Sequence, residues 1–436
     1  MRVCVVGGGG REHALAHVLG RSCEVVVTPG NAGIVGSTPV PAEEIAADLY
    51  VIGPEAPLVE GLADKLRARG KLVFGPGADG ARLEGSKGWM KQLLVSAGVP
   101  TAAHGTFSEA AQALKFLDTL GDLFVIKTDG LAAGKGVLVT EDRAEADAAV
   151  RDYISGEAFG DAGRRVVIEE GLSGPELSLL ALCDGNRAVC LAPAQDFKRV
   201  GEGDVGPNTG GMGAYSPVPQ APLSLVEEVM ERAVLPTLAE LQKRGIDYRG
   251  VLYAGLMLTT EGVKVLEYNV RFGDPEAQVV LPRLHNDLAE MLAQAAAGQL
   301  CVEPLYSDDA AVTVVCAAQG YPGSARVGDA IQGIEAANAS EGVTVFCAGV
   351  ASAPVAVGAP HKQPDSFAEG DKSLALRGGG LVTAGGRVLS VTGQGPSLAA
   401  ARERAYGGVA QIDWPGRYFR GDIAWAGISD NLERSA

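Results

Sequence analysis

Strand-like segments alternate with helical segments over residues 1 to about 83, and this alternation restricts the possible folds more than any other feature. "RVCVVGGGG" combines a strand with a glycine loop and "REHALAHVLG" predicts a short helix, while "CEVVVTPG", "DLYVIGPE" and "KLVFGPG" predict strands that end in Gly/Pro loops. Such alternation predicts a parallel sheet whose ligands collect at the carboxyl ends of the strands. We therefore expect an N-terminal parallel α/β domain over residues 1–83.

The loop from Gly7 to Gly10, followed by Arg11, falls at that edge of the expected sheet. It does not match the dinucleotide fingerprint G-x-G-x-x-G, because Glu12 and His13 occupy the positions of the third glycine. A glycine loop that precedes a helix can still bind a smaller phosphate through backbone N–H groups. The alternative is a tight turn that serves packing alone.

A second glycine-rich loop, "GLAAGKGVLV" at residues 130–139, is predicted to be the tip of a β-hairpin. A P-loop needs Ser or Thr after its lysine and a helix behind the loop, whereas Gly136 follows Lys135 and the strand-like "VLVT" comes next. "LFVIKT" before the loop also predicts a strand, with Lys127 near its end. Backbone N–H groups in such a tip can surround an anion. The alternative is a flexible tip with a solvated lysine.

The rest of the chain divides into a central region, residues 84–300, and a C-terminal region, residues 305–430. The central region opens with the predicted helix "EGSKGWMKQLLVSAG", for which Ser86 is the expected N-cap. "RRVVIEEGLSGPELSLLAL" and "GVLYAGLMLTTEGVKVLEYNVRFGDPE" predict antiparallel strands. The C-terminal region is rich in Val and Gly, and it ends with a predicted strand and helix in "GGRVLSVTGQGPSLAAARERAYGGVAQI".

Charge and composition narrow the class of function. The net charge of −16 at pH 7 and the pI near 4.9 argue against nucleic acid as the main partner. Seven cysteines without C-x-x-C spacing are typical of reduced thiols in a cytosolic protein. No apolar run reaches the roughly 20 residues of a membrane span, and the N-terminus begins as a strand rather than as a signal peptide. We therefore expect a cytoplasmic protein without a nucleic-acid or membrane partner.

Candidate binding residues cluster in the central region. Glu267 and Asn269 are two apart on a predicted strand, so their oxygens share one face and suit magnesium that bridges nucleotide phosphates. Arg271 continues that face, where it could neutralise phosphoryl charge. The segment "EEGLSGPE" can offer backbone groups to an adenine edge and a carboxylate to ribose hydroxyls. The alternative for each of these residues is a solvated position on an outer face.

This combination resembles the ATP-grasp enzymes, in which two α+β subdomains clamp ATP. More narrowly, the chain resembles the phosphoribosylamine–glycine ligases, also called glycinamide ribonucleotide synthetases, over nearly its whole length. The motifs that carry this resemblance are "GGGGREHAL", "VIGPEAPLVEGL", "LEGSKGWMK", "DGLAAGKGV", "APAQDFKR", "PNTGGMGAYSP" and "NVRFGDPE". The resemblance implies a multidomain α/β and α+β fold: a pre-ATP-grasp domain, an ATP-grasp clamp with a lid at about 103–172, and a β-rich α+β C-terminal domain.

The resemblance also implies the reaction. ATP, glycine and 5-phosphoribosylamine would give glycinamide ribonucleotide, ADP and phosphate through a glycyl phosphate, with Mg²⁺ (or Mn²⁺), as a step of purine biosynthesis. It is compatible with a monomer or a weak homodimer. The nearest alternative is an ATP-grasp carboxylate–amine ligase with a different acceptor. An NAD-dependent oxidoreductase lacks its fingerprint here, and a non-catalytic nucleotide sensor would have no need of the pair formed by Glu267 and Asn269.

Roles are implied residue by residue. Lys87 and Lys127 would contact the ATP phosphates, and Gly134, Lys135 and Gly136 would form the loop that closes over them. Glu169, Glu170 and Leu172 would border the adenine, and Glu176 would bind the ribose. Glu267 and Asn269 would hold the metal. Arg271 would support the transferring phosphoryl group or the glycine carboxylate, so Arg271, Lys127 and Lys87 form the expected catalytic set. The acceptor would be held by Asp196, Lys198, Asn208, Thr209 and Gly210 together with Gly8, Gly9 and Arg11.

The chain departs from the family pattern at three places. Phe197 in "AQDFKR" stands where the family usually has histidine. The family also usually has a histidine in the segment that here contains Cys347 and Val350. If either histidine assists proton removal from the attacking amine, this chain does without it. The segment at about 40–50 is shorter than in the family, which implies that a surface helix is trimmed to "PAEEIAADL".

Overall fold

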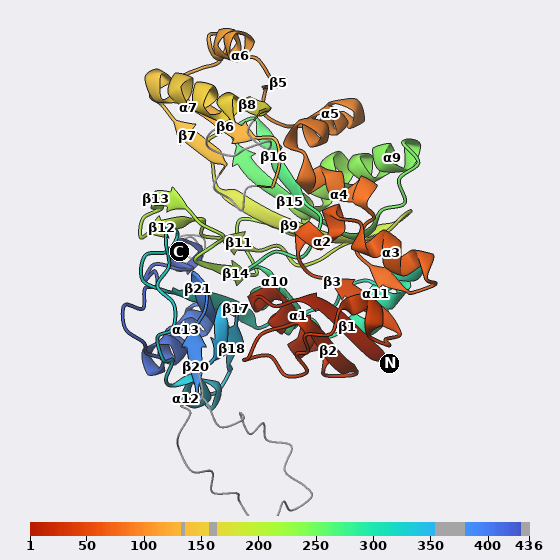
Figure 1. The fold of residues 1–436 in the computed structure, drawn as a ribbon, viewed down its shortest axis with the longest axis vertical. Coiled ribbons are helices and arrows are strands. Elements are labelled where there is room, and N and C mark those ends of the chain that lie inside the picture. The colour runs from red at the N-terminus through yellow and green to blue at the C-terminus, as the bar shows by residue number, and fades with distance from the viewer. Residues whose placement is uncertain (132–135, 157–163, 354–379, 429–436) are drawn as a thin grey trace, which may run out of the picture.

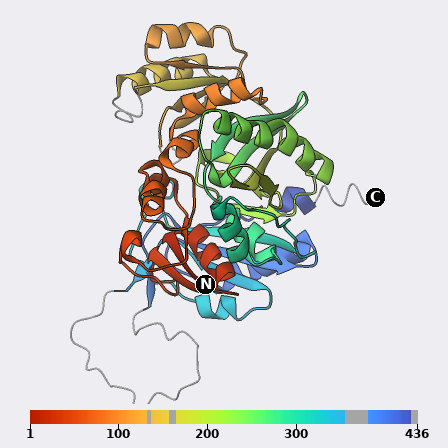
Figure 2. The same ribbon diagram turned by 90° about the vertical axis from the view of Figure 1, so that its right-hand side faces the viewer.

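The computed structural model describes residues 1–131, 136–156, 164–353 and 380–428. A small lid, made of one sheet and two helices, stands at one end of the molecule, and the N-terminal and C-terminal sheets lie side by side at the other end (Figure 1). The larger sheet of the central region lies between them, as the turned view confirms (Figure 2). The chain is therefore a multidomain protein of mixed α/β and α+β type.

The N-terminal domain contains the predicted parallel sheet, with strand order β2-β1-β3-β4. Val3 and Val5 on β1, an inner strand of this sheet, are fully buried because helices cover the sheet. The short segment before β3, where the sequence predicted a trimmed helix, forms a single 3₁₀ turn. The elements are β1 (Arg2–Gly7), α1 (Gly10–Leu19), β2 (Glu24–Pro29), η1 (Ala42–Glu44), β3 (Leu49–Ile52), α2 (Glu55–Val59), α3 (Leu62–Ala68), β4 (Val73–Phe74) and α4 (Ala78–Gly85).

The lid is an antiparallel sheet of order β5-β8-β6-β7 with two helices packed on it. The predicted hairpin is confirmed, since Lys127 on β6 pairs with Val137 on β7. A separate apolar core, which includes Ile126 and Ile168, holds the lid together. Its elements are β5 (His104–Phe107), α6 (Ala110–Leu117), β6 (Phe124–Thr128), β7 (Val137–Thr140), α7 (Arg143–Ser155) and β8 (Val166–Glu170).

The core sheet of the central region is antiparallel with the order β10-β9-β15-β16. Helix α5 begins at the predicted N-cap, where Ser86 Oγ accepts a hydrogen bond from Trp89 N at 3.2 Å, and it packs on α9. The elements are α5 (Lys87–Ala97), β9 (Glu176–Asp184), β10 (Ala188–Cys190), α8 (Leu223–Val229), the π-helical turn η3 (Met230–Val234), α9 (Leu235–Lys243), β15 (Arg249–Thr259), β16 (Gly262–Asn269), α10 (Ala277–Val280), η4 (Leu281–Arg283) and α11 (Leu288–Ala297).

A fourth sheet, of order β11-β14-β17-β21-β18, joins two regions of the sequence. Two of its strands come from residues 195–216, within the region predicted to be central, because β14 pairs with β17 across about a hundred residues. The elements are β11 (Gln195–Asp196), β12 (Arg199–Gly201), β13 (Val205–Asn208), β14 (Gly213–Ser216), β17 (Ala310–Ala317), α12 (Ile334–Asn338), β18 (Val343–Cys347), β19 (Val350–Ser352), β20 (Leu381–Thr383), β21 (Arg387–Gly395) and α13 (Leu398–Gln411).

In the part of the chain that the structure describes, no helix combines the length and the apolar character needed to cross a membrane.

Candidate active site

A cavity of about 820 Å³ lies where the lid sheet, the core sheet and both terminal domains meet. Its size is that of a site for a small molecule. The predicted residues that line it are Arg11, Lys87, Lys127, Gly136, Glu169, Glu170, Leu172, Glu176, Asp196, Lys198, Asn208, Thr209, Gly210, Glu267, Asn269 and Arg271. Gly8 and Gly9 are not lining residues, and Gly134 and Lys135 lie outside the described residues.

Strand β16 presents Glu267 and Asn269 to the cavity from one face. Tyr268 between them turns the other way, and its hydroxyl donates to Ala233 O at 3.0 Å in the core. Burial raises the pKa of Glu267, but Lys198, Lys127, Lys87 and Arg271 together bring it below its ordinary value. Glu267 is therefore ionised at neutral pH. A carboxylate and an amide oxygen on one face fit a hard divalent cation.

Lys87 reaches the cavity from the first residue of α5, immediately after the Ser86 cap. Its ammonium lies 3.5 Å from Gly130 O, at the start of the glycine-rich loop. Asp129 steadies this end of the helix, because its Oδ1 accepts hydrogen bonds from Ser86 Oγ at 2.9 Å and Gly88 N at 3.0 Å. The cap thus places one cation beside the loop that was predicted to cover phosphates.

Lys127 lines the cavity from the lid and is paired with Glu169. Its Nζ lies 2.8 Å from Glu169 Oε1, while Oε2 of the same carboxylate lies 2.8 Å from Lys91 Nζ. Burial raises the pKa of Glu169, but the two lysines outweigh burial and lower it to about 2. Burial lowers the pKa of Lys91 to about 8, against the opposing effect of Glu169. Lys91 was not among the predicted site residues.

The link between lid and core sheet runs from β8 to β9 along the cavity wall. Glu170 Oε1 accepts a hydrogen bond from Ala103 N at 3.0 Å, and Gly171 N donates to Leu123 O at 2.8 Å. These contacts fix the two residues immediately before Leu172, which lines the cavity. The start of the segment predicted to frame the adenine is therefore held in place by one side-chain contact and one backbone contact to the lid.

Glu176 and Lys198, predicted to bind different substrates, form an ion pair of 2.6 Å. Burial opposes the charge of Lys198, but Glu176, Asp196 and Glu267 raise its pKa well above the ordinary value. Burial raises the pKa of Asp196 to about 8, although Lys198 acts in the opposite direction. The predicted ribose residue and the predicted acceptor residues thus form one connected charge network.

Arg271 is fixed by two glutamates that the sequence reasoning missed. Its Nε lies 3.2 Å from Glu55 Oε2 and its Nη2 lies 2.8 Å from Glu84 Oε1. The other oxygen of Glu84 accepts a hydrogen bond from Val270 N at 2.9 Å. Glu55 could have been found from its place after β3, because the carboxyl ends of parallel strands collect ligands.

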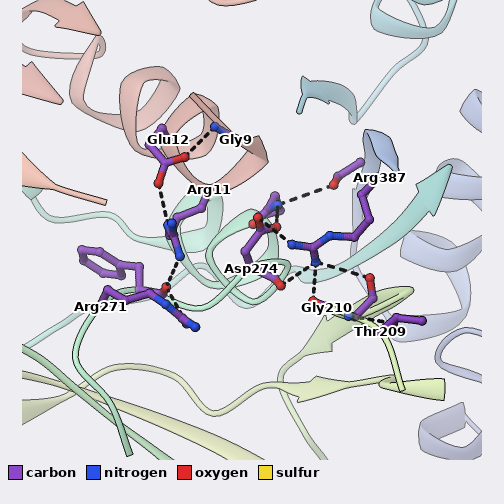
Figure 3. A network of polar contacts seen from close by, with 12 residues as sticks. Gly9, Arg11, Glu12, Thr209, Gly210, Arg271, Asp274 and Arg387 are labelled. Atoms are coloured by element: carbon purple, nitrogen blue, oxygen red, sulfur yellow. Dashed lines mark hydrogen bonds and ion pairs between the residues drawn. The ribbon is translucent and has the colours of Figure 1, made fainter. Parts of the chain in front are cut away.

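A second arginine enters the cavity from the C-terminal domain (Figure 3). Arg387 donates to Gly210 O, to Asp274 O at 2.8 Å and to Asp274 Oδ2 at 3.0 Å. Gly210 N in turn donates to Tyr321 Oη at 3.0 Å. Arg387 and Asp274 both lie in motifs quoted above. No local signal singled out Arg387, because its partners lie more than a hundred residues away.

The N-terminal glycine loop shapes this corner of the cavity without lining it (Figure 3). Gly9 N donates to Glu12 Oε2 at 2.6 Å, and the other oxygen of Glu12 holds Arg11 Nε at 2.6 Å. Arg11 Nη1 also donates to Phe272 O at 3.2 Å. The loop therefore positions Arg11, which is the lining residue at this end.

The two positions that depart from the family pattern serve packing. The ring of Phe197 lies 5.0 Å from the Arg420 guanidinium and 6.1 Å from the Tyr215 ring. Cys347 is buried, which raises the pKa of its thiol to about 12. Its backbone N donates to His13 Nδ1 at 2.8 Å. Neither side chain lines the cavity.

Comparison with known proteins gives consistent matches along the chain. Models of phosphoribosylglycinamide synthetase match with the N domain at residues 1–84, the ATP-grasp (A) domain at 85–277 and the C domain at 311–426. The phosphoribosylamine–glycine ligase of Mesorhizobium japonicum is 44% identical over 446 residues, with 98% of this chain and 99% of its own covered. That of Synechocystis is 47% identical over 450 residues, with 97% and 99% covered.

A solved structure is also similar over almost the entire chain. The crystal structure of phosphoribosylamine–glycine ligase from Thermotoga maritima matches with a TM-score of 0.80 and 34% sequence identity. The match covers 97% of this chain and 100% of that one.

Proposed function

The chain belongs to the phosphoribosylglycinamide synthetase family, and we propose that it joins glycine to 5-phosphoribosylamine at the expense of ATP. The products are glycinamide ribonucleotide, ADP and phosphate, and the reaction is a step of purine biosynthesis. One observation supports this reaction above others: lysines on the lid and on α5 face the carboxylate–amide pair of β16 across one cavity. Such an arrangement suits phosphoryl transfer, which depends on positioning and charge neutralisation.

The chemistry proceeds in two displacements. A carboxylate is a poor electrophile, so a glycine carboxylate oxygen first attacks the γ-phosphorus of ATP, and ADP leaves. The amine of phosphoribosylamine then attacks the acyl carbon of glycyl phosphate, phosphate leaves and the amine loses a proton. Neither displacement needs a protein nucleophile.

We assign the phosphate contacts to Lys87 and Lys127. A role in covering the phosphates is also proposed for Gly136 and, outside the described residues, for Gly134 and Lys135. Arg271 neutralises charge on the transferring phosphoryl group or on the glycine carboxylate. Its two glutamate partners hold the guanidinium in one orientation, so little reorganisation is needed when charge develops. These three cationic residues are the proposed catalytic set.

Glu267 and Asn269 are the proposed metal ligands. The carboxylate is ionised, and among the described residues none pairs with it within 4 Å, so it is available to a cation. Magnesium or manganese held there would neutralise charge on the ATP phosphates. Nucleotide phosphates would supply further oxygen ligands, consistent with the lack of any cluster of three or more His, Cys, Asp or Glu ligands among the described residues.

The remaining roles divide between nucleotide and acceptor. We propose that the backbone from Glu169 to Leu172 borders the adenine and that Glu176 binds the ribose. Asp196, Lys198, Asn208, Thr209 and Gly210 would hold phosphoribosylamine together with Arg11, with Gly8 and Gly9 shaping the loop behind it. The protein would act in the cytoplasm on these small molecules, as a monomer or a weak homodimer.

The test is ADP release with magnesium and glycine, with and without phosphoribosylamine generated in situ from ribose 5-phosphate and ammonia. We expect release to require both substrates and to fall by at least ~100-fold in Glu267→Ala, the scale on which a lost electrostatic contact to developing charge acts. Glu261→Ala, an exposed glutamate just before the same strand, is the matched control. ADP release that does not depend on phosphoribosylamine would show that the acceptor is another amine.

A further inference from the structure

Three charged side chains form a buried cluster behind the cavity wall. Glu169 on β8 lies between Lys91 on α5 and Lys127 on β6. Its Oε2 lies 2.8 Å from Lys91 Nζ, and its Oε1 lies 2.8 Å from Lys127 Nζ. The side chains of Lys91, Glu169 and Lys127 are 0%, 2% and 8% exposed. Lys127 lines the cavity whereas Lys91 does not. A fully buried lysine that does not line this cavity requires an explanation, because burial of a charge is costly unless it is paired.

The cluster also connects the lid to the core sheet. Lys91 Nζ donates to Thr101 Oγ1 at 2.7 Å, and that hydroxyl donates to Val265 O at 2.6 Å. Lys127 Nζ lies 3.5 Å from Leu266 O. Both lysines therefore tie the carboxylate of the lid to consecutive carbonyls of β16, immediately before Glu267. The lid sheet and the strand of the proposed metal ligands share one polar anchor.

We propose that Lys91 is a positioning residue for nucleotide binding, acting through Glu169 on the Lys127 ammonium. This inference rests on the proposed function of the cavity. Lys91 occupies one carboxylate oxygen, so Lys127 is held by the other alone and stays at the cavity surface. Without Lys91, both oxygens of Glu169 are free to draw Lys127 inward.

Charge balance leads to the same conclusion. Two ammonium groups share one carboxylate, so the cluster carries a net charge of one positive unit that faces the cavity through Lys127. Removal of Lys91 leaves a neutral Lys127–Glu169 pair, and the cavity loses attraction for anionic phosphates. Lys91 stands four residues after Lys87 on α5, so the two lysines share one helix face. Lys87 lines the cavity, and Lys91 orients the Lys127 ammonium across it.

The test compares Lys91→Met with wild type in two measurements: the Kd of MgADP by calorimetry, and the steady-state constants of ADP release. We expect the Kd of MgADP and the KM of ATP to rise at least tenfold, with the KM of phosphoribosylamine within twofold. Gln92→Met, an exposed neighbour on the same helix, should match wild type. Nucleotide constants of Lys91→Met equal to those of wild type would overturn the proposal.

A double-mutant cycle separates positioning from general loss of structure. In a Lys127→Met background, Lys91→Met should change the Kd of MgADP by less than twofold, because its effect passes through Lys127. Equal losses in both backgrounds would assign Lys91 to folding alone. If Lys91→Met does not fold, Lys91→Met/Glu169→Gln removes the buried carboxylate that has lost one of its two partners. This variant should fold yet lower kcat at least tenfold, because no carboxylate then holds Lys127 in place. Wild-type kcat in that variant would contradict the inference.

The same data distinguish failure of this inference from failure of the proposed function. If wild type releases no ADP that depends on both substrates, the proposed reaction is wrong. The Kd of MgADP still measures the effect of Lys91 in that case.

Discussion

Two glutamates on facing sheets lie near cations in this cavity, but only one of them forms ion pairs among the described residues. Glu169 is neutralised by two lysines at 2.8 Å, whereas the pKa of Glu267 is lowered by cations that form no ion pair with it within 4 Å among the described residues. Both carboxylates are ionised, but only Glu267 has oxygens available to a ligand. The same residue type therefore forms an internal anchor in one case and lines the cavity as the proposed metal ligand in the other.

Thiol reactivity is predicted to follow burial. Cys301 is exposed, and burial raises the pKa of Cys4, Cys316 and Cys347 to about 12. Because the thiolate is the reactive form, a brief treatment of native protein with a thiol reagent should label Cys301 and spare these three until urea unfolds the chain. Mass spectrometry of the labelled peptides measures this, with Cys301→Ser as the control. Labelling of Cys347 as fast as Cys301 would show that the core around it is open.

At the scale of single residues, sequence could identify those whose role depends on near neighbours. Ser86 caps its helix as predicted, because capping is set within four residues. Glu267 and Asn269 share a face because strand periodicity places them there. Arg387 and Lys91 were missed, since their significance comes from partners on other elements that no local pattern specifies.

At the scale of elements, the backbone that approaches the glycine loop after β1 limits which side chains this loop can accept. A Cβ at Gly8 would lie 2.4 Å from Gly30 O, a backbone atom that cannot rotate away, whereas a Cβ at Gly9 would meet side-chain oxygens first, at 3.0 Å. Gly8→Ala should therefore cost about 1–3 kcal/mol of stability, as overpacking does, and raise the KM of phosphoribosylamine. Gly9→Ala should cost less, because the Glu12 oxygen it meets has to shift by only a few tenths of an ångström.

Urea unfolding of the two variants measures this difference. Equal midpoints for Gly8→Ala and Gly9→Ala would contradict the argument from the Gly30 carbonyl.

Element types were easier to predict than their partners. The parallel N-terminal sheet and the β6–β7 hairpin are confirmed, because short-range apolar patterns and glycine positions determine them. The membership of β11 and β14 in the C-terminal sheet was not predicted. Pairing of β14 with β17 is decided by tertiary packing across about a hundred residues. The alternation of apolar and polar residues along a strand does not specify which strand it pairs with.

At the scale of the whole molecule, the C-terminal domain contributes directly to the cavity. We predict that Arg387→Met raises the KM of phosphoribosylamine about tenfold, equivalent to about 1.4 kcal/mol, because the Gly210 loop loses its support. The KM of ATP should remain within twofold, since among the described residues the polar contacts of the Arg387 side chain go to Gly210, Gly211 and Asp274, none of which lies in the lid. Steady-state kinetics measure both, with exposed Arg326→Met of the same domain as control. A rise in the KM of ATP alone would place Arg387 at the nucleotide.

The central claim is that ATP activates the carboxyl group of glycine inside the cavity. Its most direct test uses glycine labelled with heavy oxygen (¹⁸O) in the carboxyl group, together with ATP, magnesium and phosphoribosylamine, and mass analysis of the phosphate released. Transfer through glycyl phosphate predicts that each phosphate carries one heavy oxygen from glycine and that the amide product keeps the other. Release of unlabelled phosphate would show that ATP is cleaved without activating glycine, and it would contradict the account.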